Sequence, residues 1–492
     1  HAYSSIVADF FARFKSIDEH NVFFLTGTDE HGLKIQRSAE KEGQDPKAFC
    51  DQISKTFRDL SKTLNLSNTD FIRTTELRHK KSVEHLWSEL EKNDDIYLSN
   101  YSGWYSVSDE AFYNEDEIEE IDGIKKAKLS NSTVEWIEEE SYFFRLSKWQ
   151  KPLLEYYEKH PNFISPESRK NEVISFVKSG LKDLSVSRTT FSWGIKVPNN
   201  NDHVIYVWLD ALTNYLSALN YPDTNNELFK NFWPASIHLI GKDILRFHAI
   251  YWPAFLLAAD IKLPLKIYGH GWILTGEEKM SKSRGNILDP IEIIKEYGLD
   301  PLRYYLIKEV SFGNDGNISQ DRLEDCINSD LANNYGNLCQ RVTAFAFKNC
   351  EGKVPLEIKF QNDDLLILNK YKDNLENIRS KIDDQNINFY IDFIINSLFE
   401  ANKYFNDQEP WKKKDDQIRL NTIVYTTLEI VRKISFLLFP IIPESSLKAL
   451  KIFGIEEKNV KLKTISNNEY LPKELNLNKI DILFKKIEKN ND

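Results

Sequence analysis

The sequence predicts an α/β protein in which a parallel sheet is split by an insertion and followed by an α-helical bundle. Two short apolar runs, 22–25 and 237–240, each end at a glycine-containing turn and precede a helical pattern. This alternation is typical of parallel sheets. Between the two runs the chain becomes acidic and rich in turns. Beyond about residue 286, long amphipathic segments predict a helical bundle.

The first part of the chain predicts helix, strand, turn and helix. Apolar residues recur with a helical period at Ile6, Val7, Phe10, Phe11 and Phe14. The run 22–25 predicts a buried strand, residues 26–28 a turn, and 32–42 a second helix. Ligands of parallel sheets gather at the carboxyl ends of the strands, so the turn at 26–28 is a candidate binding position.

The second half of the sheet and the bundle helices are also predicted from apolar patterns. From about residue 204 the α/β pattern returns, with strands at 237–240 and 265–268 and a helix over 244–259 that contains Pro253. The amphipathic segments that predict the bundle are 331–347, 365–382, 387–405 and 420–438.

Bulk properties limit the class of protein. At 492 residues we expect two to four domains, and the 41% hydrophobic and 28% charged content is ordinary for a soluble chain. No apolar run is long enough for a membrane span. Four cysteines without a Cys-x-x-Cys pair indicate reduced thiols, a cytoplasmic protein and no zinc site. The net charge of −11 neither suggests nor excludes nucleic-acid binding.

The most informative stretch is Lys279-Met280-Ser281-Lys282-Ser283, which holds the only methionine of the chain. Lysines can follow the charge that builds on a leaving pyrophosphate, and hydroxyl groups can bind phosphate oxygens. Taken alone, the stretch is most often a solvated basic loop, because short motifs specify function loosely.

Four further stretches occur in order with it: Thr26-Gly27-Thr28-Asp29-Glu30-His31-Gly32, Val207-Trp208-Leu209-Asp210-Ala211, Gly241-Lys242-Asp243-Ile244 with Phe247-His248, and His270-Gly271. Together the five resemble the methionyl-tRNA synthetase family of class I aminoacyl-tRNA synthetases over essentially the whole chain. The resemblance implies a Rossmann-like catalytic domain, and a methionine–tRNA ligase that forms methionyl-adenylate from methionine and ATP before charging tRNA.

In the family, the lysine loop works with a His-x-Gly-His stretch at the first helix. His1-Ala2-Tyr3 resembles its end, so we expect a fragment or trimmed chain that lacks the first strand. The resemblance implies His1, Lys279 and Lys282 as catalytic groups, and ATP as the magnesium complex. The implied ATP-binding residues are His1, His270, Gly271, Ile273, Lys279, Ser281, Lys282, Ser283, Gly241 and Asp243. His270 as a purely structural buried histidine is an equal alternative.

The resemblance also implies a methionine pocket of Asp29, Trp208, Ala211, Leu212, Tyr215, Ile244 and His248. Asp29 suits the substrate ammonium, with a helix cap as the alternative. Trp208 and Tyr215 suit the thioether because sulfur packs well on aromatic edges, with core packing as the alternative for Trp208. Asp243 is expected near the ribose, and it is also a candidate cap.

For tRNA(Met), the resemblance implies that Asn337, Arg341 and Trp411 read the anticodon. Asn337 and Arg341 are four residues apart and share a helix face, and an indole can stack on a base. An Asn/Arg pair alone is most often a solvated face. Arg188 is expected near the acceptor end, with a structural ion pair as an equal alternative.

The implied division is a Rossmann-like first half over 1–96, an insertion over 97–190, a second half over 191–272, a lysine-loop region over 273–325 and an anticodon-binding bundle over 326–492. Residues 103–110 have serines where many relatives carry zinc-binding cysteines. We therefore expect no structural zinc and an insertion that is held by packing. We also expect a monomer.

Three alternatives stay open. One is a class I synthetase for another aliphatic amino acid, although the chain lacks room for a large editing insertion. Another is a non-catalytic tRNA-binding relative. The third is a nucleotidyl transferase, which would not explain a C-terminal bundle that carries Asn337, Arg341 and Trp411.

Overall fold

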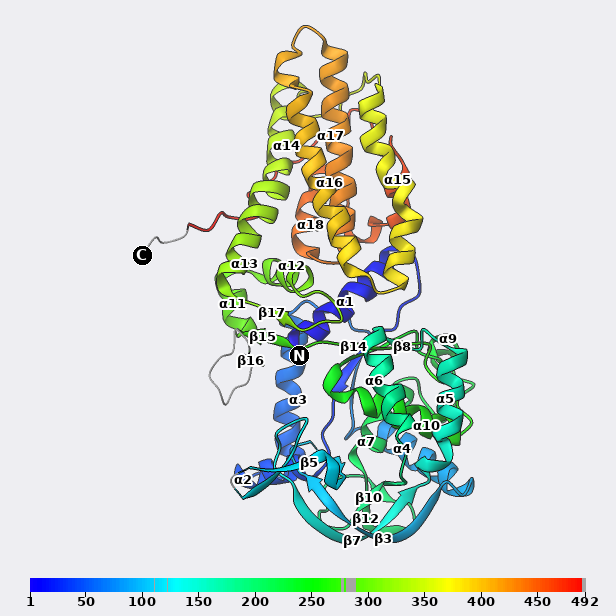
Figure 1. Cartoon of the computed structure of the whole chain (residues 1–492). Coiled ribbons are helices and arrows are strands. Elements are labelled where there is room, and N and C mark those ends of the chain that lie inside the picture. Colours follow the sequence, from blue (N-terminus) through cyan, green and yellow to red (C-terminus); the bar gives the residue numbers. More distant parts are fainter. Residues whose placement is uncertain (110, 122, 276–277, 280–288, 489–492) are drawn as a thin grey trace. The chain divides into compact units, whose positions relative to one another are not determined.

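A computed structural model describes residues 1–109, 111–121, 123–275, 278–279 and 289–488 (Figure 1). The chain forms two compact units, one made of His1–Val22 with Gly271–Asp492 and the other of Phe23–His270. The first helix therefore shares a unit with the C-terminal half of the chain. The division into five consecutive segments is finer than this and stays a prediction.

The Phe23–His270 unit contains two parallel sheets. Strand β1 (Leu25–Thr28) pairs with β2 (Asp70–Arg73), while β14 (Ile267–His270) lies between β13 (His238–Gly241) and β8 (Ile164–Ser165). The α-helices of the unit are α2 (Leu33–Lys41), α3 (Pro46–Thr63), α4 (Leu77–Lys92), α5 (Gln150–Lys159), α6 (Glu167–Lys178), α7 (Val207–Leu212), α8 (Asn214–Ser217), α9 (Glu227–Phe232) and α10 (Trp252–Ala258). The predicted α/β class is confirmed.

Three element predictions were wrong in detail. The strand predicted over 265–268 is β14, which covers Ile267–His270. Strand β1 begins at Leu25 and includes the predicted turn residues, because residues 25–28 pair with β2 and Gly27 lies against the backbone there. A Cβ on Gly27 would lie 2.1 Å from the carbonyl oxygen of Ile72. The helix predicted over 244–259 is continuous as far as Ala258. Its hydrogen bonding changes along it, from the 3-10 helix η3 (Lys242–Ile244) through the π-helix η4 (Phe247–Tyr251) to α10. π-Helical turns are often found at functional sites.

The insertion is mainly antiparallel. Strand β3 (Ile96–Ser106) pairs with β7 (Glu135–Phe144) along its length, and β4 (Ala111–Tyr113) and β9 (Leu184–Ser185) extend this sheet. The other strands of the region are β5 (Ile118–Ile121), β6 (Ile124–Ala127), β10 (Ser187–Arg188), β11 (Lys196–Val197) and β12 (Asn200–Ile205).

The serine-containing part of the insertion has polar as well as aromatic contacts. The Asp109 carboxylate accepts hydrogen bonds from Tyr113 at 2.8 Å and Ser132 at 2.8 Å, and from Ser130. The rings of Trp104 and Trp136 meet edge to face at 5.1 Å. Aromatic packing was expected, whereas the carboxylate–hydroxyl cluster was not. The absence of zinc stays a prediction.

The other unit is largely helical. Its α-helices are α1 (Ala2–Ile17), α11 (Pro290–Tyr297), α12 (Leu299–Glu309), α13 (Gln320–Cys326), α14 (Asn337–Asn349), α15 (Asn362–Asp383), α16 (Ile387–Asp407), α17 (Gln417–Leu438) and α18 (Pro443–Leu450). The π-helix η6 (Ile327–Gly336) leads directly into α14. Three short strands, β15 (Ile273–Thr275), β16 (Glu278–Lys279) and β17 (Gly316–Asn317), form a small sheet.

The bundle is built around α17. Helices α14, α15 and α16 all pack against it (Figure 1), and its residues are almost all buried. The helix also buries charged side chains, of which Arg432 pairs with Glu429 at 2.8 Å. The predicted bundle is confirmed. No helix in the described part of the chain is long and apolar enough to cross a membrane.

Candidate functional site

The predicted site residues are divided between the two units. Those of the methionine pocket, together with Arg188, Gly241, Asp243 and His270, belong to Phe23–His270. His1, Gly271, Ile273 and Lys279 belong to the other unit, as do the three anticodon residues. Ser281, Lys282 and Ser283 lie outside the described residues. The structure therefore bears on the pocket and the anticodon group, each within its own unit.

The aromatic wall of the predicted pocket is built from α7 and η4. The indole of Trp208 stacks on Phe247, with ring centroids 3.8 Å apart and an interplanar angle of 6°. The ring of His248 approaches the same indole edge to face at 6.2 Å. Trp208 is partly buried and packs against the hydrophobic core of its unit, so a pocket role and core packing both stay open. Phe247 belongs to a quoted motif, but its role as the partner of Trp208 was missed.

Tyr215 and His248 form a buried hydrogen-bonded pair. The Tyr215 hydroxyl oxygen lies 2.9 Å from Nε2 of His248, and Nδ1 of His248 lies 3.0 Å from the carbonyl oxygen of Ile244. A carbonyl only accepts, so Nδ1 carries the proton and Nε2 accepts from the tyrosine hydroxyl. Burial lowers the pKa of His248 to about 4, so the ring is neutral at physiological pH.

His238 completes this group and was not predicted. Its ring stacks on Tyr215 at 3.9 Å, and its Nε2 accepts a hydrogen bond from Nε1 of Trp252 at 3.3 Å. Burial lowers its pKa well below the ordinary value. A histidine within an apolar strand was the available signal, because buried polar side chains require a partner.

The other predicted pocket residues lie on α7, on η3 and between β1 and α2. Ala211 and Leu212 are buried on α7, and the carbonyl group of Ile244 is the acceptor for His248. Asp29 is exposed in the segment between β1 and α2. The residue that caps α2 is Gly32, so the alternative interpretation of Asp29 as a helix cap is wrong.

The predicted nucleotide residues of this unit meet at the ends of two parallel strands. Gly241 and His270 are paired across β13 and β14, and His270 is buried. A Cβ on Gly241 would lie 2.6 Å from Oδ1 of Asp243 and 3.9 Å from the His270 ring. Any larger residue would displace the Asp243 carboxylate. Gly241, Asp243 and His270 therefore form one cluster at the carboxyl ends of the strands.

Gly271, His1, Ile273 and Lys279 are described in the other unit. A Cβ on Gly271 would lie 2.2 Å from the backbone of Asn314. The glycine therefore allows two backbone segments of the protein to approach each other closely. His1 precedes α1 and is exposed. Ile273 begins β15, and Lys279 ends β16 opposite Leu274.

Arg188 is buried, with only 1% of its surface exposed. It donates from Nη1 to the carbonyl oxygen of Ser187 at 2.6 Å and to Oγ of Ser185 at 2.8 Å. Its guanidinium group lies over the rings of Tyr206, at 4.8 Å, and Tyr105. These contacts favour the structural alternative over a direct contact with tRNA.

The predicted anticodon residues gather around one phenylalanine. The guanidinium of Arg341 lies 5.4 Å from the centre of the Phe405 ring, and the Trp411 ring meets Phe405 edge to face at 6.2 Å. Arg341 also donates to Oδ1 of Asn406 at 2.7 Å. Asn337 lies one turn before Arg341 on α14, and Trp411 is 42% exposed. Phe405 and Asn406 on α16 were missed.

In the described residues, no group of three or more His, Cys, Asp or Glu side chains is placed to hold a metal ion. Magnesium is expected as part of the ATP complex. It stays a prediction.

Comparison with known proteins places the chain in a family. The family model described as "tRNA synthetases class I (M)" matches residues 1–123 and 123–343, and that of the "Anticodon binding domain of methionyl tRNA ligase" matches residues 355–492. A methionine–tRNA ligase of Brucella suis biovar 1 is 50% identical over 92% of this chain and 88% of its own. One from Rickettsia conorii is 49% identical over 99% and 96%.

A solved structure agrees with these matches. The Mycobacterium tuberculosis methionyl-tRNA synthetase bound by methionyl-adenylate superimposes with a TM-score of 0.95 at 44% identity, covering 99% of this chain and 96% of its own. The chain belongs to the methionyl-tRNA synthetase family of class I aminoacyl-tRNA synthetases.

Proposed function

We infer that this chain is a methionine–tRNA ligase. The carboxylate oxygen of methionine attacks the α-phosphorus of ATP, and the bond to the bridging oxygen breaks so that pyrophosphate leaves. A ribose hydroxyl at the 3′ end of tRNA(Met) then attacks the carbonyl carbon of the adenylate, and AMP leaves. Both steps depend on positioning and charge stabilisation more than on a strong acid or base.

The observation that carries this proposal is the Trp208–Phe247 and Tyr215–His248 group. It presents aromatic faces and edges beside a neutral polar pair, which suits a polarizable thioether. A neutral His248 matters here, because a charged imidazolium would draw water into a pocket for an uncharged side chain. Asp29, exposed between β1 and α2, supplies the negative charge that a substrate ammonium requires.

The nucleotide would lie against Gly241, Asp243 and His270 at the strand ends. Asp243 is assigned to the ribose, because a carboxylate accepts hydrogen bonds from hydroxyl groups. The other residues assigned to ATP are His1, Gly271, Ile273, Lys279, Ser281, Lys282 and Ser283, and of these the basic and hydroxyl side chains suit the phosphates. Lys282 is assigned to the charge that develops on pyrophosphate.

The tRNA would be recognised through the surface around Phe405. Trp411 offers an exposed face for stacking on an unpaired base. Arg341 is held by Asn406 and Phe405, and Asn337 lies beside it on α14, so guanidinium and amide donors lie on one face. Reading of base edges by such groups is the usual way in which single-stranded loops of RNA are recognised.

The proposal is tested by charging a tRNA(Met) transcript with radiolabelled methionine in the presence of magnesium and ATP. We expect charging of the transcript with a CAU anticodon and a loss of at least about tenfold when one anticodon base is changed. Charging that ignores the anticodon would contradict the role of α14 and Trp411. A chain that binds the transcript without charging it would be a non-catalytic relative.

A further inference from the structure

The segment that carries Asp29 passes from an exposed residue directly to buried ones. Asp29 is exposed, whereas Glu30 and His31, which follow it directly, are each only 3% exposed. Burying a carboxylate and an imidazole is costly unless both are paired. The contacts of these two neighbours therefore show what fixes the segment on which Asp29 lies.

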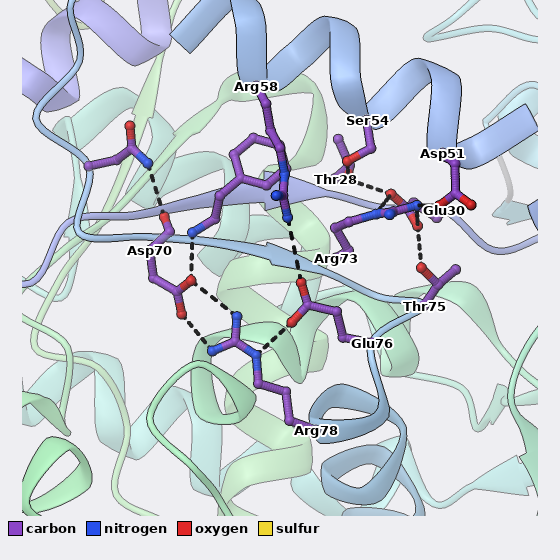
Figure 2. A network of polar contacts seen from close by, with 12 residues as sticks. Thr28, Glu30, Asp51, Ser54, Arg58, Asp70, Arg73, Thr75, Glu76 and Arg78 are labelled. Atoms are coloured by element: carbon purple, nitrogen blue, oxygen red, sulfur yellow. Dashed lines mark hydrogen bonds and ion pairs between the residues drawn. The ribbon is translucent and has the colours of Figure 1, made fainter. Parts of the chain in front are cut away.

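Glu30 is fixed on one side (Figure 2). Its Oε1 accepts from Oγ1 of Thr28 at 2.7 Å and from Nε of Arg73 at 2.7 Å, while Oε2 accepts from Nη2 of Arg73 at 3.0 Å and from Thr75. Arg73 in turn lies 2.6 Å from Asp51 on α3. The Glu30 carboxylate is thus tied to the end of β2 by a bidentate ion pair, which is geometrically specific.

His31 is fixed on the other side. Its Nδ1 lies 2.7 Å from Oδ2 of Asp210, and Oδ1 of Asp210 lies 2.7 Å from Nε2 of His79. Nδ1 of His79 then lies 2.9 Å from Oγ of Ser217. Asp210 and His79 are fully buried, so this carboxylate is shared between two imidazoles out of reach of water.

The contacts of Asp210 connect the segment that carries Asp29 with other elements of the proposed methionine pocket. Asp210 lies between Trp208 and Ala211 on α7, and Ser217 lies two residues after Tyr215. The His31–Asp210 contact therefore connects the segment that carries Asp29 with the elements that carry the aromatic wall. The contact thus ties the segment that carries Asp29 to α7, on which Trp208 lies.

We propose that Glu30 and Asp210 are positioning residues for the methionine site. Held from both sides, the segment presents the Asp29 carboxylate in one place, which lowers the cost of ordering it when the substrate ammonium binds. This inference rests on the proposed function, in which Asp29 binds that ammonium. Neither Glu30 nor Asp210 is assigned a contact with substrate.

The test compares methionine with its α-hydroxy analogue, which has a hydroxyl group in place of the ammonium. The quantity measured is the ratio of their dissociation constants, obtained by competition against the methionine-dependent ATP–pyrophosphate exchange. We expect Glu30→Gln and Asp210→Asn each to reduce the preference for methionine by about tenfold, as for loss of a charge-assisted contact. A structural defect would instead lower the amount of active enzyme and leave the ratio unchanged.

The matched control is Asp70→Asn. Asp70, on the same strand as Arg73, makes a bidentate pair with Arg78 of α4 at 2.7 and 3.1 Å, and within the described residues it has no hydrogen bond to Glu30 (Figure 2). This variant should keep the wild-type ratio. If Asp210→Asn does not fold, Thr75→Val, which removes one donor to Glu30, should reduce the ratio in the same direction by a smaller factor.

The variant Asp29→Asn distinguishes failure of the proposed function from failure of the inference about Glu30 and Asp210. If Asp29→Asn leaves the ratio of the two dissociation constants unchanged, the assignment of Asp29 to the ammonium is wrong. The inference about Glu30 and Asp210 is then wrong as well. If Asp29→Asn reduces the ratio while Glu30→Gln and Asp210→Asn keep the wild-type value, the proposed function stands and the inference is overturned.

Discussion

The hydroxyl group of Tyr215 lies 2.9 Å from Nε2 of His248, and the other ring nitrogen of His248 is held by the carbonyl oxygen of Ile244. The tautomer of His248 is therefore fixed by the backbone, and Tyr215 is oriented by the histidine. A neutral, oriented pair of this kind suits an uncharged substrate side chain and excludes a cationic one.

Replacing Tyr215 with phenylalanine removes the hydroxyl group and leaves the ring. Loss of a neutral hydrogen bond costs about 1 kcal/mol, so we expect KM for methionine to rise about fivefold with little change in kcat. Methionine-dependent ATP–pyrophosphate exchange measures both constants. Tyr97→Phe is the control, because it removes a hydroxyl group bonded to Asp183 in the insertion. Equal effects of Tyr215→Phe and Tyr97→Phe on KM for methionine would contradict the placement of Tyr215 in the methionine pocket.

His248 should make the fold sensitive to mild acid. Its pKa is about 4 in the folded protein and near 6.5 when exposed, so between these values the unfolded chain binds the extra proton. Stability is therefore complete above pH 6.5 and falls as the pH drops towards 4, by up to about 3 kcal/mol. Urea unfolding at stepwise pH measures this slope. His248→Asn, which keeps a donor for Ile244, should make the slope shallower while His238 still contributes in the same direction, and an unchanged slope would refute the assignment of His248.

Trp411→Ala should impair the charging of tRNA and leave the activation of methionine unchanged. The indole offers a stacking surface, and loss of one stacked base costs about 1–3 kcal/mol. We expect KM for tRNA to rise about tenfold or more, while methionine-dependent exchange without tRNA stays at the wild-type rate. Trp136→Ala, at a similarly exposed tryptophan of the insertion, is the control and should alter neither. A fall in exchange would argue against the anticodon assignment.

Lys282→Ala tests the lysine loop, which the sequence alone assigns. Removing one group that stabilises transition-state charge lowers the rate by roughly a hundredfold or more. We expect this loss in the rate of adenylate formation, measured in a single turnover, with methionine affinity nearly unchanged. Lys414→Ala, in an exposed run of lysines, should be neutral. An equal loss of rate and affinity would contradict a role in the transition state.

Periodicity and family motifs predicted most of the fold. The bundle helices could be recognised because long amphipathic segments such as 387–405 carry a strong signal, and α16 covers Ile387–Asp407. The start of β1 could not be predicted, because Thr26, Gly27 and Thr28 resemble a turn and become a strand only by pairing with β2. The π-helix η4 likewise depends on packing that a periodic pattern does not encode.

Site residues that belong to a family motif could be predicted from the sequence. Residues whose role depends on a neighbour in space could not. Trp208, Tyr215 and His248 carry family signals, and the structure brings them together. His238 lies in a short apolar run and Phe405 near the end of an amphipathic segment, so only three-dimensional contacts reveal their roles. For Arg188 the sequence left contact with tRNA and a structural role equally open, because burial of an arginine among hydroxyl and carbonyl groups has no local pattern.

The central claim is that the pocket around Trp208, Tyr215 and His248 selects methionine. The most direct measurement is amino-acid-dependent ATP–pyrophosphate exchange, compared at equal concentrations of methionine and leucine. A preference for methionine of at least about a hundredfold is expected, since leucine has no thioether to contact the aromatic edges. Exchange driven equally well by leucine, or by leucine alone, would contradict the account.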